Sequence, residues 1–311
     1  MNTYNNYLKC SNSIFKFLQK NDNGYSIFHY TSPDGLSSII QNGKLRFTDR
    51  FFLNDESEGI YVLELLAKEF DLIIDKTFPL SIIKDDIIKQ CKDYKQTITT
   101  YQFKIYQISF SLDRDSLCMW NYYTKGNDIR GYNIEFNPKE ICEKLNLGKD
   151  KKAPYILNGK VIYDRTEQIT EVKKLLNSFY DAILLDYNND VDEAIKFFKK
   201  HLSCILQRLT LLGTFFKSEY FKIENEYRIA LDLNIDESGH TPNIDAKRKF
   251  MSKKDFFVPY YDIDFDRNAI KSITLSPTID RYEGRKNVKM LLDEQEMKAV
   301  DIKQSQIPVR F

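Results

Sequence analysis

Residues 26–58 read SIFHYTSPDGLSSIIQNGKLRFTDRFFLNDESE, and this stretch decides the fold that we predict. Its first six residues are rich in apolar and aromatic side chains, with Ile27, Phe28 and Tyr30, which is typical of a buried strand. A helix should follow, because Ser32 can cap its first turn. Pro33 suits the first helical position, since an N–H group there would have no partner within the helix. Gly43 stands where a left-handed residue commonly ends a helix, and a second strand follows it directly.

This order places His29 at the end of a strand, beside the start of a helix. Exposed N–H groups at a helix start attract anions, so the imidazole would lie where a phosphate-bearing ligand can bind. The alternative is a structural histidine whose hydrogen bonds are satisfied inside the protein. For the other two histidines we predict a structural role for His201 and a surface position for His240.

The composition indicates a globular protein of near-neutral charge. Of 311 residues, 42% are hydrophobic and 14% aromatic, enough to build a core without disulfides. The 46 basic and 45 acidic residues nearly cancel, which argues against a charge-driven nucleic-acid binder but not against a local basic groove. Five cysteines lack any CxxC or Cys/His spacing, so we expect free thiols, no metal site and a cytoplasmic location. There is no signal peptide pattern and no apolar run of about 20 residues, so no membrane is expected as a partner.

The pattern of strands and helices predicts one α+β domain over residues 1–311, with a mixed twisted sheet surrounded by helices. Residues 1–24 form a peripheral N-terminal segment. Two long amphipathic stretches, 166–187 and 191–216, predict a helical hairpin inserted over 166–216.

Two further stretches carry side chains suited to binding or chemistry. Trp120, Tyr122 and Tyr123 follow a predicted strand end and could stack a planar ring, or could simply pack a helix on the sheet. Glu224 and Glu226 are two apart, so an extended chain would point both to one side. Two such carboxylates repel each other, so their proximity indicates either nearby cations or a functional role. The alternative is that both are exposed to solvent at the start of a strand.

Six short motifs give the chain a resemblance to a bacterial family known only as domain of unknown function 2971. They are FHYTS (28–32), LNDESE (53–58), ISFS (108–111), MWNYY (119–123), ENEYRIAL (224–231) and SQIPVRF (305–311). The family name implies no activity.

More distantly, the chain resembles ADP-ribosyltransferases. FHYTSPDGLSSIIQNG is similar to their first motif, Ser109 and Ser111 to their second, and Glu224-Asn225-Glu226 to their third. His29 matches the His-Tyr-Glu style of these enzymes, whereas the Ser-x-Ser strand matches the Arg-Ser-Glu style. The resemblance implies an ADP-ribosyltransferase-like sheet, with NAD as substrate and no metal.

The same resemblance implies a role for each residue. Glu226 would stabilise the oxocarbenium-like transition state as nicotinamide leaves, and Glu224 would orient the acceptor. His29 would hold the adenosine ribose, Thr31 would face the phosphates, and Tyr30 with Tyr122 or Tyr123 would stack the nicotinamide. Arg46 and Arg228 are candidate phosphate clamps, although a plain surface arginine is the alternative for both.

The function expected from this resemblance is that of an NAD-dependent ADP-ribosyltransferase-like effector, in a toxin or phage-defence role. The acceptor, protein or nucleic acid, and any regulatory partner protein stay open. One alternative is a non-catalytic module that senses a nucleotide or another ligand. A nucleic-acid-acting effector is a further alternative, which the sequence favours less because Asp and His metal ligands are not clustered.

Overall fold

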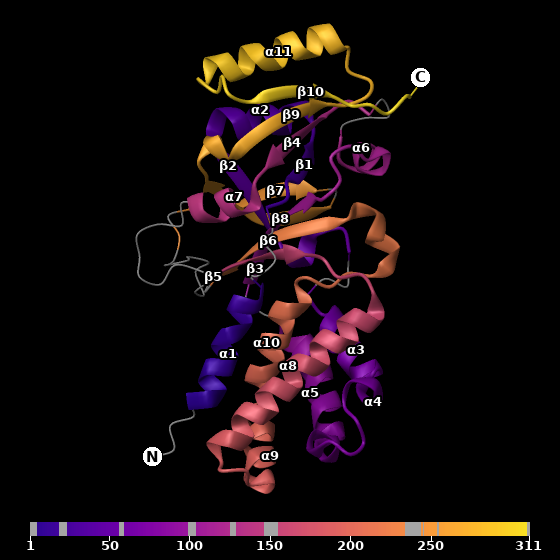
Figure 1. The fold of residues 1–311 in the computed structure, drawn as a ribbon, viewed down its shortest axis with the longest axis vertical. Helices are drawn as coiled ribbons and strands as arrows, with labels where there is room; N and C mark the ends of the chain where they lie inside the picture. Colours follow the sequence, from indigo (N-terminus) through magenta and orange to yellow (C-terminus); the bar gives the residue numbers. More distant parts are fainter. Residues whose placement is uncertain are drawn as a thin grey trace. The chain divides into compact units, whose positions relative to one another are not determined.

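The computed structural model describes residues 5–18, 24–55, 59–98, 104–124, 129–145, 155–233, 244, 246–253 and 255–309 (Figure 1). His240 and part of the LNDESE motif lie outside these residues.

The chain separates into two compact units, each built from three segments. The helical unit comprises Met1–Lys20, Arg50–Lys104 and Val161–Phe221, and the sheet unit comprises Asn21–Asp49, Ile105–Lys160 and Lys222–Phe311. The helical insertion predicted over 166–216 lies entirely in the helical unit. Because the segments of the two units alternate along the chain, no single linker marks a boundary in the sequence.

The fold class is α+β, and the described strands form a ten-stranded open mixed sheet. The strand order is β10-β9-β4-β1-β3-β2-β8-β7, with β6 pairing with β3 and β5. β9 and β10 run parallel, and the other pairs of described register run antiparallel. The strands are β1 (Ile27–Thr31), β2 (Lys44–Asp49), β3 (Lys104–Ser111), β4 (Tyr132–Phe136), β5 (Tyr155–Lys160), β6 (Glu226–Leu233), β7 (Lys249–Lys253), β8 (Phe256–Asp264), β9 (Ile270–Leu275) and β10 (Asp301–Gln304).

The strand–helix–strand unit predicted at the start of the chain is confirmed. Helix α2 (Pro33–Asn42) begins after Ser32, whose Oγ accepts a hydrogen bond from the N–H of Gly35 at 3.2 Å. It ends at Gly43, which adopts a left-handed conformation with φ of 61°. Leu36, Ile39 and Ile40 are its buried residues, as the helical spacing predicts.

Among the residues that the structure describes, three more α-helices belong to the sheet unit. They are α6 (Leu117–Tyr123), α7 (Pro138–Lys144) and α11 (Arg281–Glu294). α11 connects β9 to its parallel neighbour β10 and lies along both strands, as the yellow end of Figure 1 shows. A parallel pair needs such a crossover, because a tight turn can only join antiparallel strands.

The two faces of β1 pack in two different hydrophobic clusters. The larger, here called the main core, contains Ile27 together with the helix side chains of α2 and side chains from the other strands. The smaller contains Phe28, Tyr30 and Trp120. Since successive side chains of a strand point to opposite faces, β1 packs α6 on one face and the main core on the other.

The helical unit contains α1 (Asn5–Leu18), α3 (Tyr61–Lys68), α4 (Phe70–Ile73), α5 (Lys84–Ile98), α8 (Arg165–Asp186), α9 (Val191–Lys200) and α10 (Leu202–Gly213). Of the described 3₁₀ helices, η1 (Arg50–Phe52) and η2 (Pro79–Ile83) belong to the helical unit and η4 (Arg267–Ala269) to the sheet unit, while η3 (Glu219–Glu224) begins in the helical unit and ends in the sheet unit. The single helix predicted over 191–216 is wrong: His201 ends α9 and precedes α10, and its ring stacks on Phe197 at 4.1 Å. His201 therefore has the structural role that the sequence predicts.

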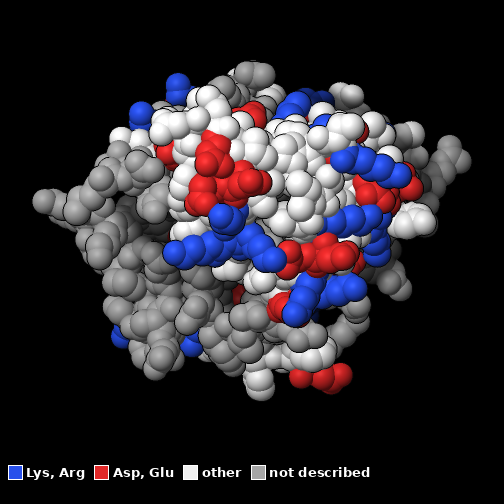
Figure 2. All heavy atoms as spheres, turned by 90° about the horizontal axis from the view of Figure 1, so that it is seen from below, with Lys and Arg blue, Asp and Glu red and all other residues white. Residues whose placement is uncertain are grey.

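On the face in Figure 2, Lys and Arg side chains lie beside Asp and Glu, in keeping with the net charge of +1. Within the described parts of the chain, the helices are too short or too polar to cross a bilayer.

Candidate functional site

All predicted site residues belong to the sheet unit, but they do not form one cluster. They divide among a corner around Glu224, a buried ion pair, the packing around β1 and the outer surface.

Two segments distant in sequence converge on Glu224. The Oγ of Ser111, at the end of β3, donates a hydrogen bond to the carbonyl oxygen of Glu224 at 2.8 Å. The hydroxyl of Tyr123, at the end of α6, donates to Glu224 Oε1 at 3.1 Å, across 101 positions of sequence. We call Ser111, Tyr123, Glu224 and Asn225 the Glu224 corner.

Asn225 gives this corner an unusual backbone. Its φ of 41° lies in the left-handed region, which asparagine tolerates better than most residues but which still costs free energy. Its Nδ2 donates to Asp113 Oδ1 at 2.9 Å, and its carbonyl accepts from the N–H of Leu112 at 2.8 Å. Strained residues held by such contacts occur often at functional sites.

Glu224 and Glu226 are not two residues of one extended strand. Glu224 ends η3 and only Glu226 lies in β6, with the left-handed Asn225 between them. The alternation that would point both carboxylates to one side therefore does not apply. Each carboxylate has its own partner, Tyr123 for Glu224 and Arg228 for Glu226.

Glu226 and Arg228 form a buried bidentate ion pair. Arg228 Nε lies 2.7 Å from Glu226 Oε1, and Arg228 Nη2 lies 2.9 Å from Glu226 Oε2. Only 3% of Glu226 and 1% of Arg228 is exposed. A transition-state role for Glu226 would require its negative charge, which the guanidinium of Arg228 offsets. Because Arg228 is engaged in this pair, it is not a free phosphate clamp.

His29 and Glu226 lie on opposite faces of the sheet. His29 shares a face with Ile27, and its ring meets the ring of the main-core residue Phe110 edge-on at 5.6 Å. Tyr227 packs in the same core, so Glu226, its neighbour in β6, points to the other face. The structure does not bring together the imidazole and the acid that the resemblance pairs.

Burial also determines the charge of His29. It lowers the pKa of the imidazole, although a hydrogen-bonding contact at 3.2 Å between Nδ1 and the carbonyl oxygen of Ser109 acts in the opposite direction. The half-buried ring is therefore neutral at neutral pH, and Ser109 contributes its backbone rather than its hydroxyl.

Two other residues of the first motif act as structural anchors. The Tyr30 hydroxyl donates to the carbonyl of Asp113 at 2.7 Å and accepts from the N–H of Ser116 at 3.0 Å. Its ring meets Trp120 edge-on at 4.7 Å. Thr31 is buried against the first turn of α2, where a side chain on Gly35 would lie 2.0 Å from its Oγ1.

Arg46 and Tyr122 are on the outside. Arg46 pairs with Asp262 at 3.1 Å and lies 3.9 Å over the ring of Tyr260, so it is a surface arginine held by β8. Tyr122 is 66% exposed and offers a free ring face next to the Glu224 corner residue Tyr123.

The sequence prediction missed the importance of Asp115. Its carboxylate accepts hydrogen bonds from Trp120 Nε1 at 2.8 Å, from Ser305 Oγ at 2.7 Å and from the N–H of Gln306 at 2.8 Å. It thereby ties the loop after β3 to α6 and to the C-terminal segment. The signal was the pair of aspartates in SLDRDS, directly after a strand end.

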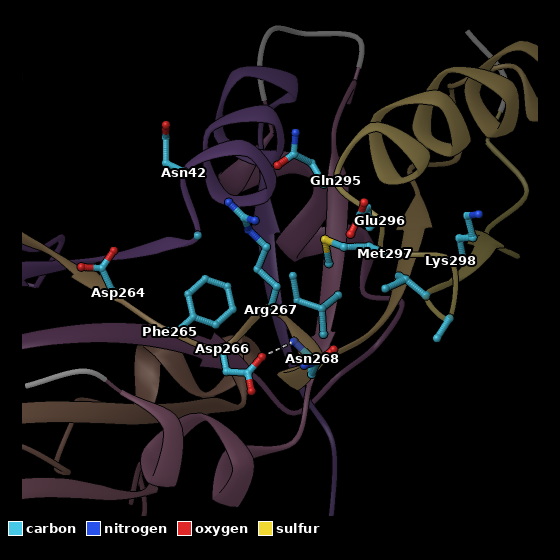
Figure 3. A pocket seen from close by; sticks show the side chains of 14 residues that line it. Asn42, Asp264, Phe265, Asp266, Arg267, Asn268, Gln295, Glu296, Met297 and Lys298 are labelled. Carbon is cyan, nitrogen blue, oxygen red and sulfur yellow. Dashed lines mark hydrogen bonds between the residues drawn. The ribbon is translucent and has the colours of Figure 1, made fainter.

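Two cavities lie elsewhere in the sheet unit. One of about 500 Å³, shown in Figure 3, is lined by Arg267 and Lys298 but also by Asp264, Asp266 and Glu296. Arg267 Nη2 donates to the carbonyl of Gln41 at 2.5 Å, so this arginine stabilises the end of α2. The other, of about 450 Å³, is predominantly cationic. No cluster of His, Cys, Asp and Glu that could hold a metal occurs among the described residues.

Residues 119–229 match the family described as "Protein of unknown function (DUF2971)". The matched region includes most of α6 as well as Glu224, Glu226 and Arg228, and so covers the Glu224 corner except for Ser111. No curated protein and no solved structure matches the chain. None of these comparisons supports the resemblance to ADP-ribosyltransferases.

Proposed function

We propose that the sheet unit senses a nucleoside-containing ligand of the NAD class at the Glu224 corner, without transferring ADP-ribose. The observation that carries this proposal is the contact of Tyr123 with Glu224, which places a carboxylate beside aromatic side chains. Carboxylates bind ribose hydroxyls in many nucleotide sites, and an exposed ring such as Tyr122 can stack a planar base. A ribose hydroxyl would replace the Tyr123 hydroxyl as donor to Glu224.

The ion pair of Glu226 favours sensing over transfer. In transfer, the bond between the ribose C1′ and the nicotinamide nitrogen breaks, and nicotinamide leaves with the electron pair. A carboxylate near C1′ lowers the barrier only if its charge is available to the growing positive charge. Glu226 gives its two oxygens to Arg228, and His29 lies on the other face of the sheet.

A second candidate is ADP-ribosyl transfer with Glu224 as the catalytic carboxylate. The strained Asn225 beside Glu224 favours it, because such strain is often retained at reacting sites. A role in a bacterial toxin or phage-defence system, with a regulatory partner protein in the cytoplasm, is part of both proposals and is supported by the resemblance alone.

The test combines NAD binding by calorimetry with an assay of free nicotinamide. For the sensing function we expect binding without nicotinamide release, and a loss of about 10- to 100-fold in affinity for Glu224→Gln, equivalent to one charge-assisted hydrogen bond. Tyr122→Ala should also weaken binding. Glu294→Gln, which removes an exposed carboxylate of α11, is the matched control and should bind as the wild type does.

Nicotinamide release that Glu224→Gln abolishes would establish the second candidate instead. A wild-type protein that binds neither NAD nor its adenosine and nicotinamide halves would refute both.

A further inference from the structure

The cationic cavity lies along β10 and reaches the carboxyl ends of the parallel strands β9 and β10. Leu275 ends β9 and Gln304 ends β10, and the two residues are paired in the sheet. The chain then continues through Ser305 and Gln306, which also line the cavity. In open sheets, ligands bind preferentially outside the carboxyl ends of parallel strands.

Four cationic side chains and one carboxylate line this cavity. The cations are Arg114, Arg281, Arg285 and Lys303, and the carboxylate is that of Asp301. Arg281 and Arg285 are one turn apart on α11, so their side chains share a helix face. Two like charges at this spacing destabilise a helix unless an anion lies between them.

Backbone contacts hold two of these arginines in place. Arg285 Nη1 donates to the carbonyl of Ile302 in β10 at 2.6 Å. The carbonyl of Arg114 accepts from Asn133 Nδ2 at 2.6 Å, which fixes the loop after β3 against β4. The guanidinium of Arg285 and the backbone that carries Arg114 are therefore in place before a ligand arrives, which reduces the entropy lost on binding.

The carboxylates next to Arg114 are already engaged. Asp113 accepts from Asn225, and Asp115 accepts from Trp120, Ser305 and Gln306. Within the described residues, no ion pair forms to Arg114 or to Arg281. Lys303, by contrast, lies 2.8 Å from Glu135 and supplies a weaker net charge.

We infer that this cavity binds a diphosphate group, carried by a nucleoside diphosphate or by pyrophosphate itself. Guanidinium groups bind phosphate oxygens in a bidentate manner, and three of them match the several charges of a diphosphate. The volume of about 450 Å³ is that of an ordinary small-molecule site. The site consists of side chains and not of helix N–H groups, because Asp280 already accepts from the N–H groups of Tyr282 and Glu283.

This inference is independent of the proposed function. Its residues differ from those of the Glu224 corner, and its probes are pyrophosphate and ADP instead of NAD. Glu224→Gln should leave pyrophosphate binding unchanged, so failure of one proposal is distinguishable from failure of the other.

The experiment measures binding of pyrophosphate and of ADP to the full chain by calorimetry at low and at physiological salt. For Arg281→Gln and Arg114→Gln we expect the Kd for pyrophosphate to rise by at least about tenfold each, the loss of one charge-assisted contact. Lys286→Gln is the matched control: it removes an exposed cation from the same helix outside the cavity and should change the Kd less than about twofold. Unchanged thermal unfolding of the free variants shows that each is folded.

The comparison of probes identifies the source of the diphosphate. Tighter binding of ADP indicates a nucleoside diphosphate, and equal or weaker binding indicates a free polyphosphate; both support the site. The inference is overturned if millimolar pyrophosphate and ADP fail to bind, or if both arginine variants bind as Lys286→Gln does.

Discussion

Breaking the ion pair between Glu226 and Arg228 should destabilise the sheet unit strongly. Both side chains are almost fully buried, and two hydrogen bonds of 2.7 and 2.9 Å join them. Replacing Arg228 by Met leaves the carboxylate of Glu226 buried without its counter-charge. Removing one partner of a buried pair typically costs about 3–5 kcal/mol, a large part of an ordinary protein's stability.

Replacing both partners should cost much less than the sum of the single changes. A buried pair gains little over apolar side chains of similar volume, since both charges must first be removed from water. We therefore expect Glu226→Met and Arg228→Met to cost about 3–5 kcal/mol each and the double variant to recover at least about 2 kcal/mol of that sum.

Trp120 makes this measurement specific to the sheet unit. It is the only tryptophan of the chain, it is fully buried, and it lies in α6. Urea unfolding followed by its fluorescence should shift by roughly 1–3 M for each single variant, given typical slopes for urea. Costs below about 1 kcal/mol, or strictly additive costs, would show that the pair does not act as a buried unit.

The result matters for any test of catalysis. An inactive Glu226→Gln protein would not identify a catalytic residue if the substitution also unfolds part of the sheet unit. The activity of each variant has to be compared with its stability.

Three further predictions use the same fluorescence assay. Asp115→Ala should destabilise the sheet unit by about 2–4 kcal/mol and shift Trp120 emission to the red, because three donors lose their acceptor; Asp115→Asn should cost less. Gly131→Ala should cost about 1–3 kcal/mol, since a Cβ would lie 2.3 Å from the Thr124 methyl group, and unchanged stability would contradict this packing. His29 should make unfolding easier as the pH falls below 6.5, because burial lowers its folded-state pKa and the unfolded chain takes up the proton first. His29→Gln should reduce the difference in unfolding free energy between pH 7.5 and pH 5, and an unchanged pH profile would contradict the neutral, buried state.

The structure brings only some of the predicted site residues together, for reasons of geometry. Sequence spacing placed Glu224 and Glu226 together, but a left-handed Asn225 separates them into different environments. The resemblance placed His29 opposite Glu226, but the alternation of β1 and β6 puts them on different faces. Neither a backbone dihedral at one asparagine nor the face on which a distant strand packs can be read from residue spacing.

The amino-acid sequence by itself determined the local elements at the start of the sheet unit. Ser32, Pro33 and Gly43 fix the ends of α2, and its apolar spacing fixes which face is buried, because these effects act over a few residues. Only the tertiary structure decided that Arg228 neutralises Glu226, that Asp115 joins three segments, and that three arginines line one cavity. Such contacts depend on how strands distant in sequence pair and which way their side chains then point, and no local pattern contains that information.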